Sequence, residues 1–283
     1  MRRLTPYLLA LPGWMWMAIF LVVPLGAMAS VSLQTGNAID GFVMTFSVSN
    51  YSDAIGGYSI QLVRSLVYGG VATLAMLVIG YPVAYWIAFK GGRHKSVYLF
   101  LLLLPFFVSF VLRTISWGFL LADDGILLGT LKSWGLLHPD FRVLATSFAV
   151  VAGLTYNFLP FMILPIYVAL ERVDPRLVEA AQDLYAGRGT AFRKVVLPLS
   201  LPGVFAGVLM TFVPATADPV NAQVLGGTSN TMIGNIIQTE YLINNDYPTA
   251  SALSFTLMAV LLVGIFAYAR VLGTENVLEA AAR

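Results

Sequence analysis

Six long apolar stretches decide what kind of fold this sequence can adopt. They lie at about 7–31, 61–89, 96–122, 144–170, 201–220 and 249–272. A helix needs about 20 mainly apolar residues to cross the hydrocarbon core of a bilayer, and each stretch is long enough. Charged residues make up 11% of the chain, against about 25% in an average soluble protein. The sequence therefore predicts an all-α polytopic membrane protein with six transmembrane helices in a single domain, residues 1–283.

The basic residues predict which way these helices run. With both termini inside, 12 of the 16 Lys and Arg residues fall in cytoplasmic segments, and only Lys132 and Arg142 fall in outer loops. Cytoplasmic loops of membrane proteins carry such an excess. The first stretch is longer than the core of a signal peptide, about 7 to 15 residues, so we expect a retained helix. These features predict a multi-pass membrane protein with both termini in the cytoplasm.

A polar segment, 171–200, separates the fourth and fifth stretches. Asp174 is placed to cap a helix whose first residue is Pro175, where the missing N–H group costs nothing. Apolar residues then recur at helical spacing on one side of this helix, and charged residues fall on the other side. The apolar set is Leu177, Val178, Ala181 and Leu184, and the charged set is Arg176, Glu179 and Asp183. The pattern predicts an amphipathic helix outside the bilayer.

A second short helix is expected after a glycine break. Gly187 suits the left-handed residue that follows a helix, because glycine enters that conformation without penalty. Thr190 is placed to cap the second helix, and Pro198 is expected to end it.

These two helices resemble the EAA loop of permease subunits of binding-protein-dependent ABC importers. The matching residues are Glu179, Ala180, Ala181, Ala186, Phe192, Val196, Leu197 and Pro198. The family usually has glycine where this chain has Tyr185. The resemblance implies the permease fold, with a cytoplasmic loop that docks on an ATP-hydrolysing subunit and passes its motion to the membrane helices. It assigns this coupling role to Asp174, Arg176, Glu179, Ala180, Ala181, Asp183, Ala186, Gly187, Phe192, Leu197 and Pro198. The alternative is an ordinary solvated loop, since an E-A-A triplet alone is common.

The resemblance also implies partners. They are a second permease subunit, two ATP-binding subunits and an extracellular or periplasmic substrate-binding protein, all assembled at the lipid bilayer of the bacterial cytoplasmic (inner) membrane. The sequence contains no G-x-x-x-x-G-K-[ST] loop, so ATP and Mg²⁺ are expected in the partner ATPases and this chain is expected to be a transport subunit, not an enzyme. Without cysteine and with two histidines, no metal site is expected. The small net charge of +2 reflects membrane topology and gives no reason to expect a nucleic-acid partner.

Four segments resemble the spermidine/putrescine branch of this family. They are 102–117, 156–161, 225–227 and 232–235. The resemblance implies a polyamine substrate, and a polycation suits carboxylates and aromatic faces. Candidate residues for a substrate path are Trp117, Asp123, Asp124, Tyr156, Asp218 and Glu240. For the aromatic residues, ordinary packing or an interfacial belt is the alternative. A sugar, iron or amino-acid type of solute is the alternative substrate.

Two charges lie within apolar stretches and are expected to meet. Charged residues inside spans are usually paired or face a polar cavity. In straight outward helices, Arg113 and Asp218 each lie 16 residues from the cytoplasmic edge, which is about 24 Å. We expect an Arg113–Asp218 pair that either locks two helices together or lines the path.

Two other classes of membrane protein fit less well. An intramembrane peptidase needs a catalytic dyad at membrane depth, but His94 and His138 fall in loops and Asp218 has no acidic partner in a facing stretch. A self-sufficient secondary transporter is expected to show inverted repeats, and no clear repeat is found.

Overall fold

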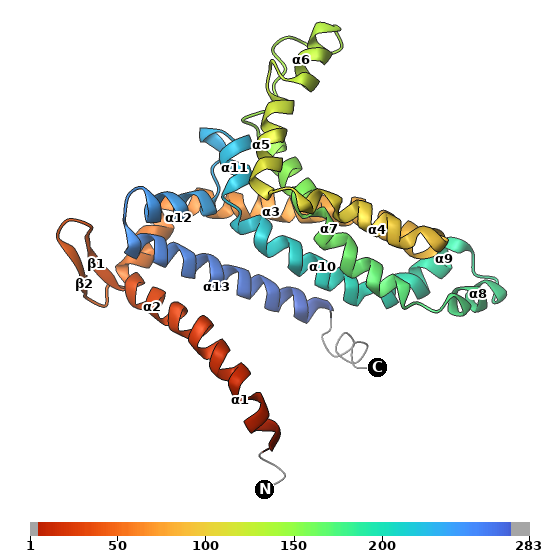
Figure 1. Ribbon diagram of the computed structural model, residues 1–283, viewed down its shortest axis with the longest axis horizontal. Helices are drawn as coiled ribbons and strands as arrows, with labels where there is room; N and C mark the ends of the chain where they lie inside the picture. The colour runs from red at the N-terminus through yellow and green to blue at the C-terminus, as the bar shows by residue number, and fades with distance from the viewer. Residues whose placement is uncertain (1–4, 273–283) are drawn as a thin grey trace. The chain divides into compact units, whose positions relative to one another are not determined.

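The computed structural model describes residues 5–272, and helices make up most of that length (Figure 1). The chain divides into two compact units. One contains the residues up to Ile60 together with Ile236–Val260. The other contains Gln61–Asn235 together with the residues from Leu261 onward.

The first unit begins with a long apolar helix. It consists of α1 (Thr5–Met17), a π-helical turn (Ala18–Val22) and α2 (Val23–Ser32). A hairpin of two antiparallel strands follows, β1 (Gln34–Asn37) and β2 (Gly41–Met44). This hairpin was not predicted from the sequence, and its four-residue strands are too short to give a clear alternating pattern.

The remaining helices are α3 (Ser49–Lys90), α4 (Lys95–Leu103), α5 (Phe110–Leu121), α6 (Ile126–Ser133), α7 (Ser147–Glu171), α8 (Pro175–Asp183), α9 (Arg188–Ala191), α10 (Leu197–Ala217), α11 (Val220–Leu225), α12 (Ile233–Leu242) and α13 (Tyr247–Leu272). The helix α3 has a kink at Tyr58, whose backbone is not helical. The expected second span corresponds to the part of α3 after this kink.

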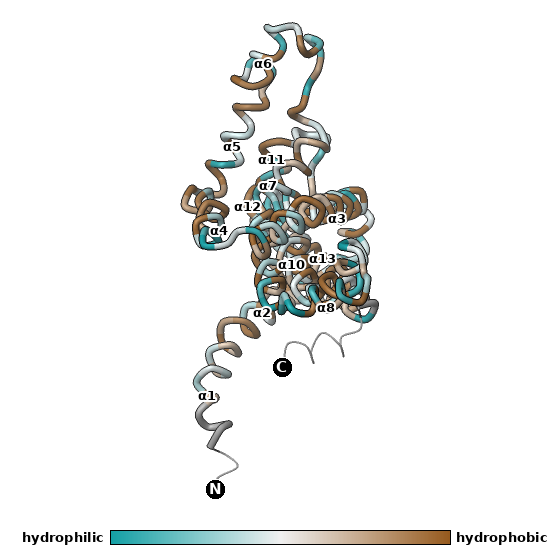
Figure 2. Tube along the Cα trace, turned by 90° about the vertical axis from the view of Figure 1, so that its right-hand side faces the viewer, coloured by the Kyte–Doolittle hydropathy of each residue, from teal (hydrophilic) through white to brown (hydrophobic). Residues whose placement is uncertain are grey.

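Five helices of the described chain are long and apolar enough to cross a membrane, and Figure 2 draws their apolar residues in brown. They are Ala10–Ser32, Ser49–Lys90, Ser147–Glu171, Arg188–Ala217 and Tyr247–Arg270. The third apolar stretch becomes a bent pair, Gly92–Phe107 and Phe110–Ser133, with an angle of 86° between its parts. The total is six spans if the bent pair counts as one.

The bend in the third stretch has a local cause. Pro105 lacks an N–H group and lies in a 3₁₀ turn, Leu104–Phe107, that follows α4. Val108 is then extended (φ −97°, ψ 139°), so the helix stops before α5 begins. The assumption of a straight outward helix from residue 96 to residue 122 is therefore wrong.

Close packing of α7 against α10 forms the centre of the second unit. Gly203 and Gly207 of α10 are spaced as in a GxxxG pattern, and both are buried. A β-carbon added at Gly203 would lie 2.5 Å from the Pro165 carbonyl oxygen, and one added at Gly207 would lie 2.8 Å from the Met162 sulfur. Small residues allow membrane helices to approach this closely.

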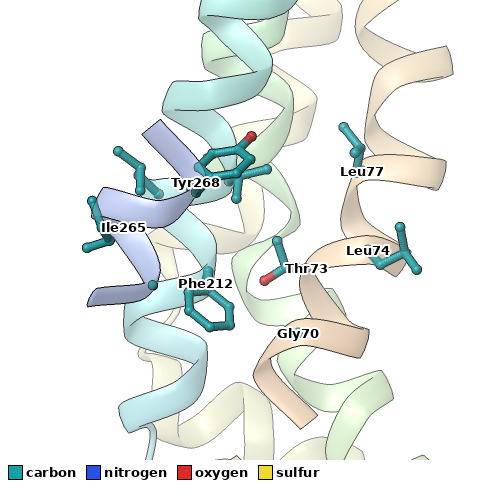
Figure 3. Close-up of a pocket in the computed structure, with 10 residues that line it drawn as sticks. Gly70, Thr73, Leu74, Leu77, Phe212, Ile265 and Tyr268 are labelled. Carbon is teal, nitrogen blue, oxygen red and sulfur yellow. The ribbon is translucent and has the colours of Figure 1, made fainter. Parts of the chain in front are cut away.

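An apolar pocket of about 350 Å³ lies among α3, α10 and α13 in the same unit (Figure 3). Thr73 and Tyr268 are its polar lining residues, and the Thr73 hydroxyl donates to the Gly69 carbonyl oxygen (2.7 Å). Tyr268 stacks on Phe205, with ring centroids 5.0 Å apart. The pocket therefore offers an almost wholly apolar surface.

Candidate functional site

The polar segment begins with the helix α8, as the sequence predicts. Asp174 caps it, and one carboxylate oxygen, Oδ1, accepts a hydrogen bond from the Arg176 backbone N–H (2.9 Å). Pro175 is the first helical residue. These two predictions are confirmed. The charged residues Arg176, Glu179 and Asp183 are exposed, as expected for the polar face.

The end of α8 differs from the sequence prediction. Tyr185, not Gly187, adopts the left-handed conformation (φ +60°). The Tyr185 N–H donates to the Gln182 carbonyl (2.9 Å) and the Ala186 N–H donates to the Ala181 carbonyl (3.1 Å), which is the Schellman pattern. This pattern fixes the left-handed residue two positions before Gly187. The expectation for Gly187 is therefore wrong.

The start of the second helix also differs. Gly187 is extended (φ −63°, ψ 159°) and precedes α9, so Thr190 lies inside the helix and does not cap it. The chain has already reversed at Tyr185, which leaves Gly187 free to take the extended capping position. The prediction for Thr190 is wrong.

Pro198 does not end the second helix. The helix α9 continues through a π-helical turn, Phe192–Val196, into α10. Leu197 N–H bonds to the carbonyl of Phe192, five residues back. Pro198 then falls in the first turn of α10, where its missing N–H group is tolerated. The second helix of the polar segment and the fifth span are therefore one continuous helical element, Arg188–Ala217.

The predicted apolar stripe of α8 divides between the core and the surface. Val178 packs against the core of the second unit. Leu177 is 49% exposed, Leu184 is 82% exposed and Tyr185 is 99% exposed. These three residues form an exposed apolar edge beside the charged face of α8. A short amphipathic helix with such an edge is suited to contact another protein.

An aromatic clasp joins the polar segment to α3. The clasp consists of Phe192 and, on α3, Tyr81 and Tyr85, whose ring centroids each lie 5.8 Å from that of Phe192 in edge-to-face geometry. The hydroxyl groups of Tyr81 and Ser200 are 2.8 Å apart and form a hydrogen bond between α3 and α10. Phe192 is therefore in direct contact with α3.

An ion pair lies at the end of α7 that precedes the polar segment. Lys95 Nζ is 3.0 Å and 2.9 Å from the two carboxylate oxygens of Glu171. The pair joins the start of α4 to the last residue of α7. Both side chains are partly exposed, so solvent and salt weaken the attraction.

Two aromatic candidates for the substrate path lie side by side. Trp117 of α5 and Tyr156 of α7 pack edge to face, with centroids 5.3 Å apart. Both are half-buried.

Asp218, at the end of α10, belongs to a buried polar network. It is 6% exposed, and its Oδ2 accepts hydrogen bonds from the backbone N–H (2.8 Å) and the side-chain amide (2.9 Å) of Asn221. Asn157 of α7 donates to Asn221 Oδ1 (3.0 Å) and to Thr114 Oγ1 (3.0 Å). The network thus connects α5, α7 and α11 to the carboxylate.

The predicted Arg113–Asp218 ion pair is not formed in this structure. Arg113 is 8% exposed, and its guanidinium lies 4.7 Å from the centroid of the Phe106 ring. Within residues 5–272, no ion pair involves Arg113, and its Nε atom has no hydrogen-bond partner. The depth estimate assumed a straight third span, and the 86° bend removes that assumption.

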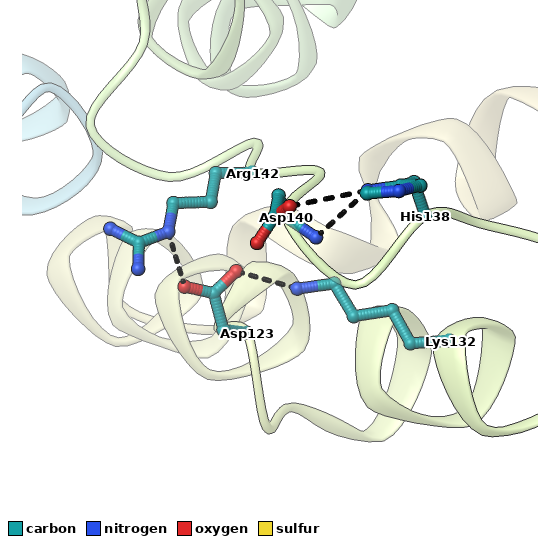
Figure 4. A network of polar contacts seen from close by, with 5 residues as sticks. All are labelled: Asp123, Lys132, His138, Asp140 and Arg142. Carbon is teal, nitrogen blue, oxygen red and sulfur yellow. Dashed lines mark hydrogen bonds and ion pairs between the residues drawn. The ribbon is translucent and has the colours of Figure 1, made fainter.

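Two other acidic candidates are already engaged. Asp123 is bonded to Lys132 (2.9 Å) and Arg142 (3.2 Å), so its charge is balanced (Figure 4). In the first unit, Glu240 accepts hydrogen bonds from Tyr58 Oη (2.6 Å) and Asn244 Nδ2 (3.0 Å). Asp124 is exposed.

Sequence reasoning did not single out the asparagines of the buried network or the tyrosines of the clasp. Asn157 lies within the segment 156–161, which resembles the spermidine/putrescine branch. A signal was present, because an amide in the middle of an apolar span is costly unless it is bonded. For Tyr81 and Tyr85 the sequence carried no such signal, since tyrosine is enriched near the ends of membrane helices.

Residues 76–272 match the family described as the inner membrane component of binding-protein-dependent transport systems. The chain belongs to this family. It is therefore a multi-pass permease of a binding-protein-dependent system in the inner membrane, and it is a transport subunit, not an enzyme. The resemblance of the sequence to ABC importer permeases is confirmed.

Known proteins support the assignment. The permease is 36% identical over 256 residues to the spermidine/putrescine transport system permease protein PotB of Haemophilus influenzae, and the match covers 90% of each chain. It is 30% identical to the inner membrane ABC transporter permease protein YdcU of Escherichia coli K12, with 96% of this chain and 91% of the relative covered. Its fold is similar to a chain in the crystal structure of a bacterial ABC transporter that imports the acidic polysaccharide alginate, with a TM-score of 0.72, 17% identity and 96% of both chains covered.

Proposed function

We propose that this permease forms half of the translocation path of an ATP-driven importer for a polyamine such as spermidine or putrescine. The observation that carries the proposal is the 36% identity to a spermidine/putrescine permease over 90% of both chains. A match of this length includes the polar segment and the buried network. The complete importer would contain a second permease subunit, two ATP-binding subunits and a substrate-binding protein on the outer side.

The buried network supports a cationic substrate. Asp218 is held by amide donors and has no counter-ion among the described residues. Trp117 and Tyr156 add aromatic faces, which attract ammonium groups. Asp123 and Glu240 would first have to leave their present partners to take part.

Reconstitution of the importer tests the substrate. The permease pair, the ATPases and the binding protein are placed in liposomes, and ATP-dependent uptake of labelled spermidine and putrescine is measured. We expect uptake that unlabelled polyamines compete away and that a neutral sugar or an amino acid does not. Uptake of a different solute class, with no uptake of polyamine, would refute the substrate.

The exposed edge of α8 and the charged face beside it, which carries Glu179, are proposed to dock on the ATPase. Glu179→Lys reverses a charge on this exposed face, so we expect normal membrane insertion but a loss of ATP-driven uptake. Glu179→Gln is the matched control, because it removes the charge without reversing it and should cause a smaller loss. Full transport by Glu179→Lys would exclude a docking role for this face.

The proposed orientation places both termini and α8 in the cytoplasm. Because the chain has no cysteine, single cysteines can report the side of the membrane. Ile39→Cys in the hairpin, which is 94% exposed, should react with an impermeant maleimide added outside intact cells. Leu184→Cys should react only after the membrane is opened. The reverse pattern would invert the topology.

A further inference from the structure

The segment between α11 and α12 is an irregular stretch that we call the elbow, residues 226–232. It contains a 3₁₀ turn, Thr228–Asn230. Irregular backbone within a membrane protein persists only where other groups bond its N–H and C=O groups. Arg64 of α3 bonds one carbonyl of the elbow, and Asn235 Oδ1 accepts from the Met232 N–H (2.9 Å).

Three side chains within about one turn of α3 hold the elbow and the start of α12. Arg64 Nη1 donates to the Thr231 carbonyl (3.0 Å). The hydroxyl of Ser65 accepts from the Ile233 N–H (2.7 Å). One turn further along α3, the Tyr68 hydroxyl donates to the side-chain oxygen of Asn230 (2.8 Å).

Asn230 connects the elbow to two further segments. Its amide nitrogen donates to the carbonyls of Ala145 and Gly226, each at 2.9 Å. Ala145 precedes α7 and has a positive φ of 61°, which is unfavourable for a residue other than glycine. Its own N–H donates to the Leu225 carbonyl (2.8 Å). A strained backbone that is held from both sides indicates a position set by function.

The same helix reaches the aromatic clasp at its other end. From Tyr68 to Tyr81 are 13 residues, or about 20 Å of helix. The single non-helical residue inside α3 is Tyr58, which lies before both sites. The helix is therefore uninterrupted between the elbow and the clasp, and it can transmit a displacement along its length.

We propose that Tyr68 and Asn230 form a latch, through which α3 carries to the elbow the movement of the polar segment, 171–200, which the proposed function makes the coupling segment. Both are positioning residues for the transport step. Coupling of this kind travels through contiguous contacts, and the chain of contacts runs from Phe192 through Tyr81 and α3 to Asn230. The latch rests on the proposed function, since it presumes that an ATPase moves the coupling segment.

Tyr68→Phe tests the latch because it removes one hydroxyl and keeps the ring. A hydrogen bond of ordinary net strength corresponds to about a fivefold change in a two-state equilibrium. In the reconstituted importer we expect ATP hydrolysis without binding protein to rise by up to about fivefold, because the coupling segment can move without the elbow. Uptake per ATP should fall by a similar factor. Tyr98→Phe is the matched control, because within residues 5–272 the Tyr98 hydroxyl has no hydrogen bond to lose.

A purely structural role would lower uptake and hydrolysis together, in proportion to the amount of assembled complex. That result, or no change in either rate, would overturn the latch. Asn230→Ala provides the second arm: adding Tyr68→Phe to it should have no further effect on the uptake-to-hydrolysis ratio, because the partner is already gone. Additive effects would also overturn the proposal.

The failure of the proposed function would look different. A wild-type complex that hydrolyses ATP but takes up no polyamine refutes the substrate, and the effect of Tyr68→Phe on hydrolysis without binding protein still tests the latch.

Discussion

Replacing Tyr185 with glycine should stabilise the turn between α8 and α9. The left-handed conformation costs a residue with a β-carbon about 1–2 kcal/mol, and glycine avoids this penalty. Tyr185 has φ +60° and its side chain is 99% exposed, so no packing within this chain is lost. Glycine also raises the conformational entropy of the unfolded loop, which lowers this gain in stability by about 0.4–1 kcal/mol. With the middle of each range, the net stabilisation is about 0.8 kcal/mol.

Amide hydrogen exchange on the purified permease, without ATPase, measures this effect. The amides to follow are those of Tyr185 and Ala186, which donate the two Schellman hydrogen bonds. A gain of about 0.8 kcal/mol corresponds to exchange that is roughly two- to fivefold slower, if these amides exchange through local opening.

Tyr185→Ala separates backbone strain from loss of the ring. Alanine keeps a β-carbon, so it should retain the strain and give no slower exchange. Equal protection in the glycine and alanine variants would refute the strain argument, and so would faster exchange in the glycine variant.

Three other variants test the packing, the cap and the ion pair. Gly203→Ala should destabilise the fold by about 1–3 kcal/mol, because the added β-carbon forces α7 and α10 apart. Gly264→Ala in α13 should not, because there an added β-carbon meets nothing within 4 Å. Thermal unfolding of the two purified variants measures the difference, and equal shifts in melting temperature would contradict the close-packing explanation. Asp174→Ala should destabilise the start of α8 by about 1 kcal/mol, because the Asp174 carboxylate accepts a hydrogen bond from the Arg176 backbone N–H. Hydrogen exchange of the Arg176 amide should become faster, and unchanged exchange would exclude a contribution from the cap. Lys95→Ala should lower stability by less than 1 kcal/mol, with the difference vanishing at high salt, because the pair is partly exposed; a larger loss that persists in high salt would contradict this.

The parts of the fold that the sequence predicted well depend on local chemistry. Asp174 and Pro175 define the start of α8 because capping needs only a side-chain oxygen and a fixed φ within one turn. The apolar stretches identify the membrane helices because the bilayer imposes one minimum length on all of them.

The parts that were predicted wrongly depend on a choice between alternatives that the sequence leaves open. Glycine at 187 suits a left-handed residue, but the Schellman hydrogen bonds select the residue that follows α8 by two positions, and this is Tyr185. Pro198 was expected to end the second helix. It instead follows a π-helical turn, Phe192–Val196, and the helix continues past it into α10. Both outcomes depend on where α8 stops, which no single residue determines.

The bend in the third stretch also explains why the two buried charges, Arg113 and Asp218, do not form an ion pair. A bend at Pro105 and Val108 turns the chain before Arg113, whose guanidinium then packs against the ring of Phe106. Asp218 is instead stabilised by amide donors of Asn221. A direct pair would cancel both charges, whereas this arrangement leaves the carboxylate without a counter-ion among residues 5–272. Under the proposed function, a carboxylate that is held only by neutral donors can pair with the positive charge of a cationic substrate.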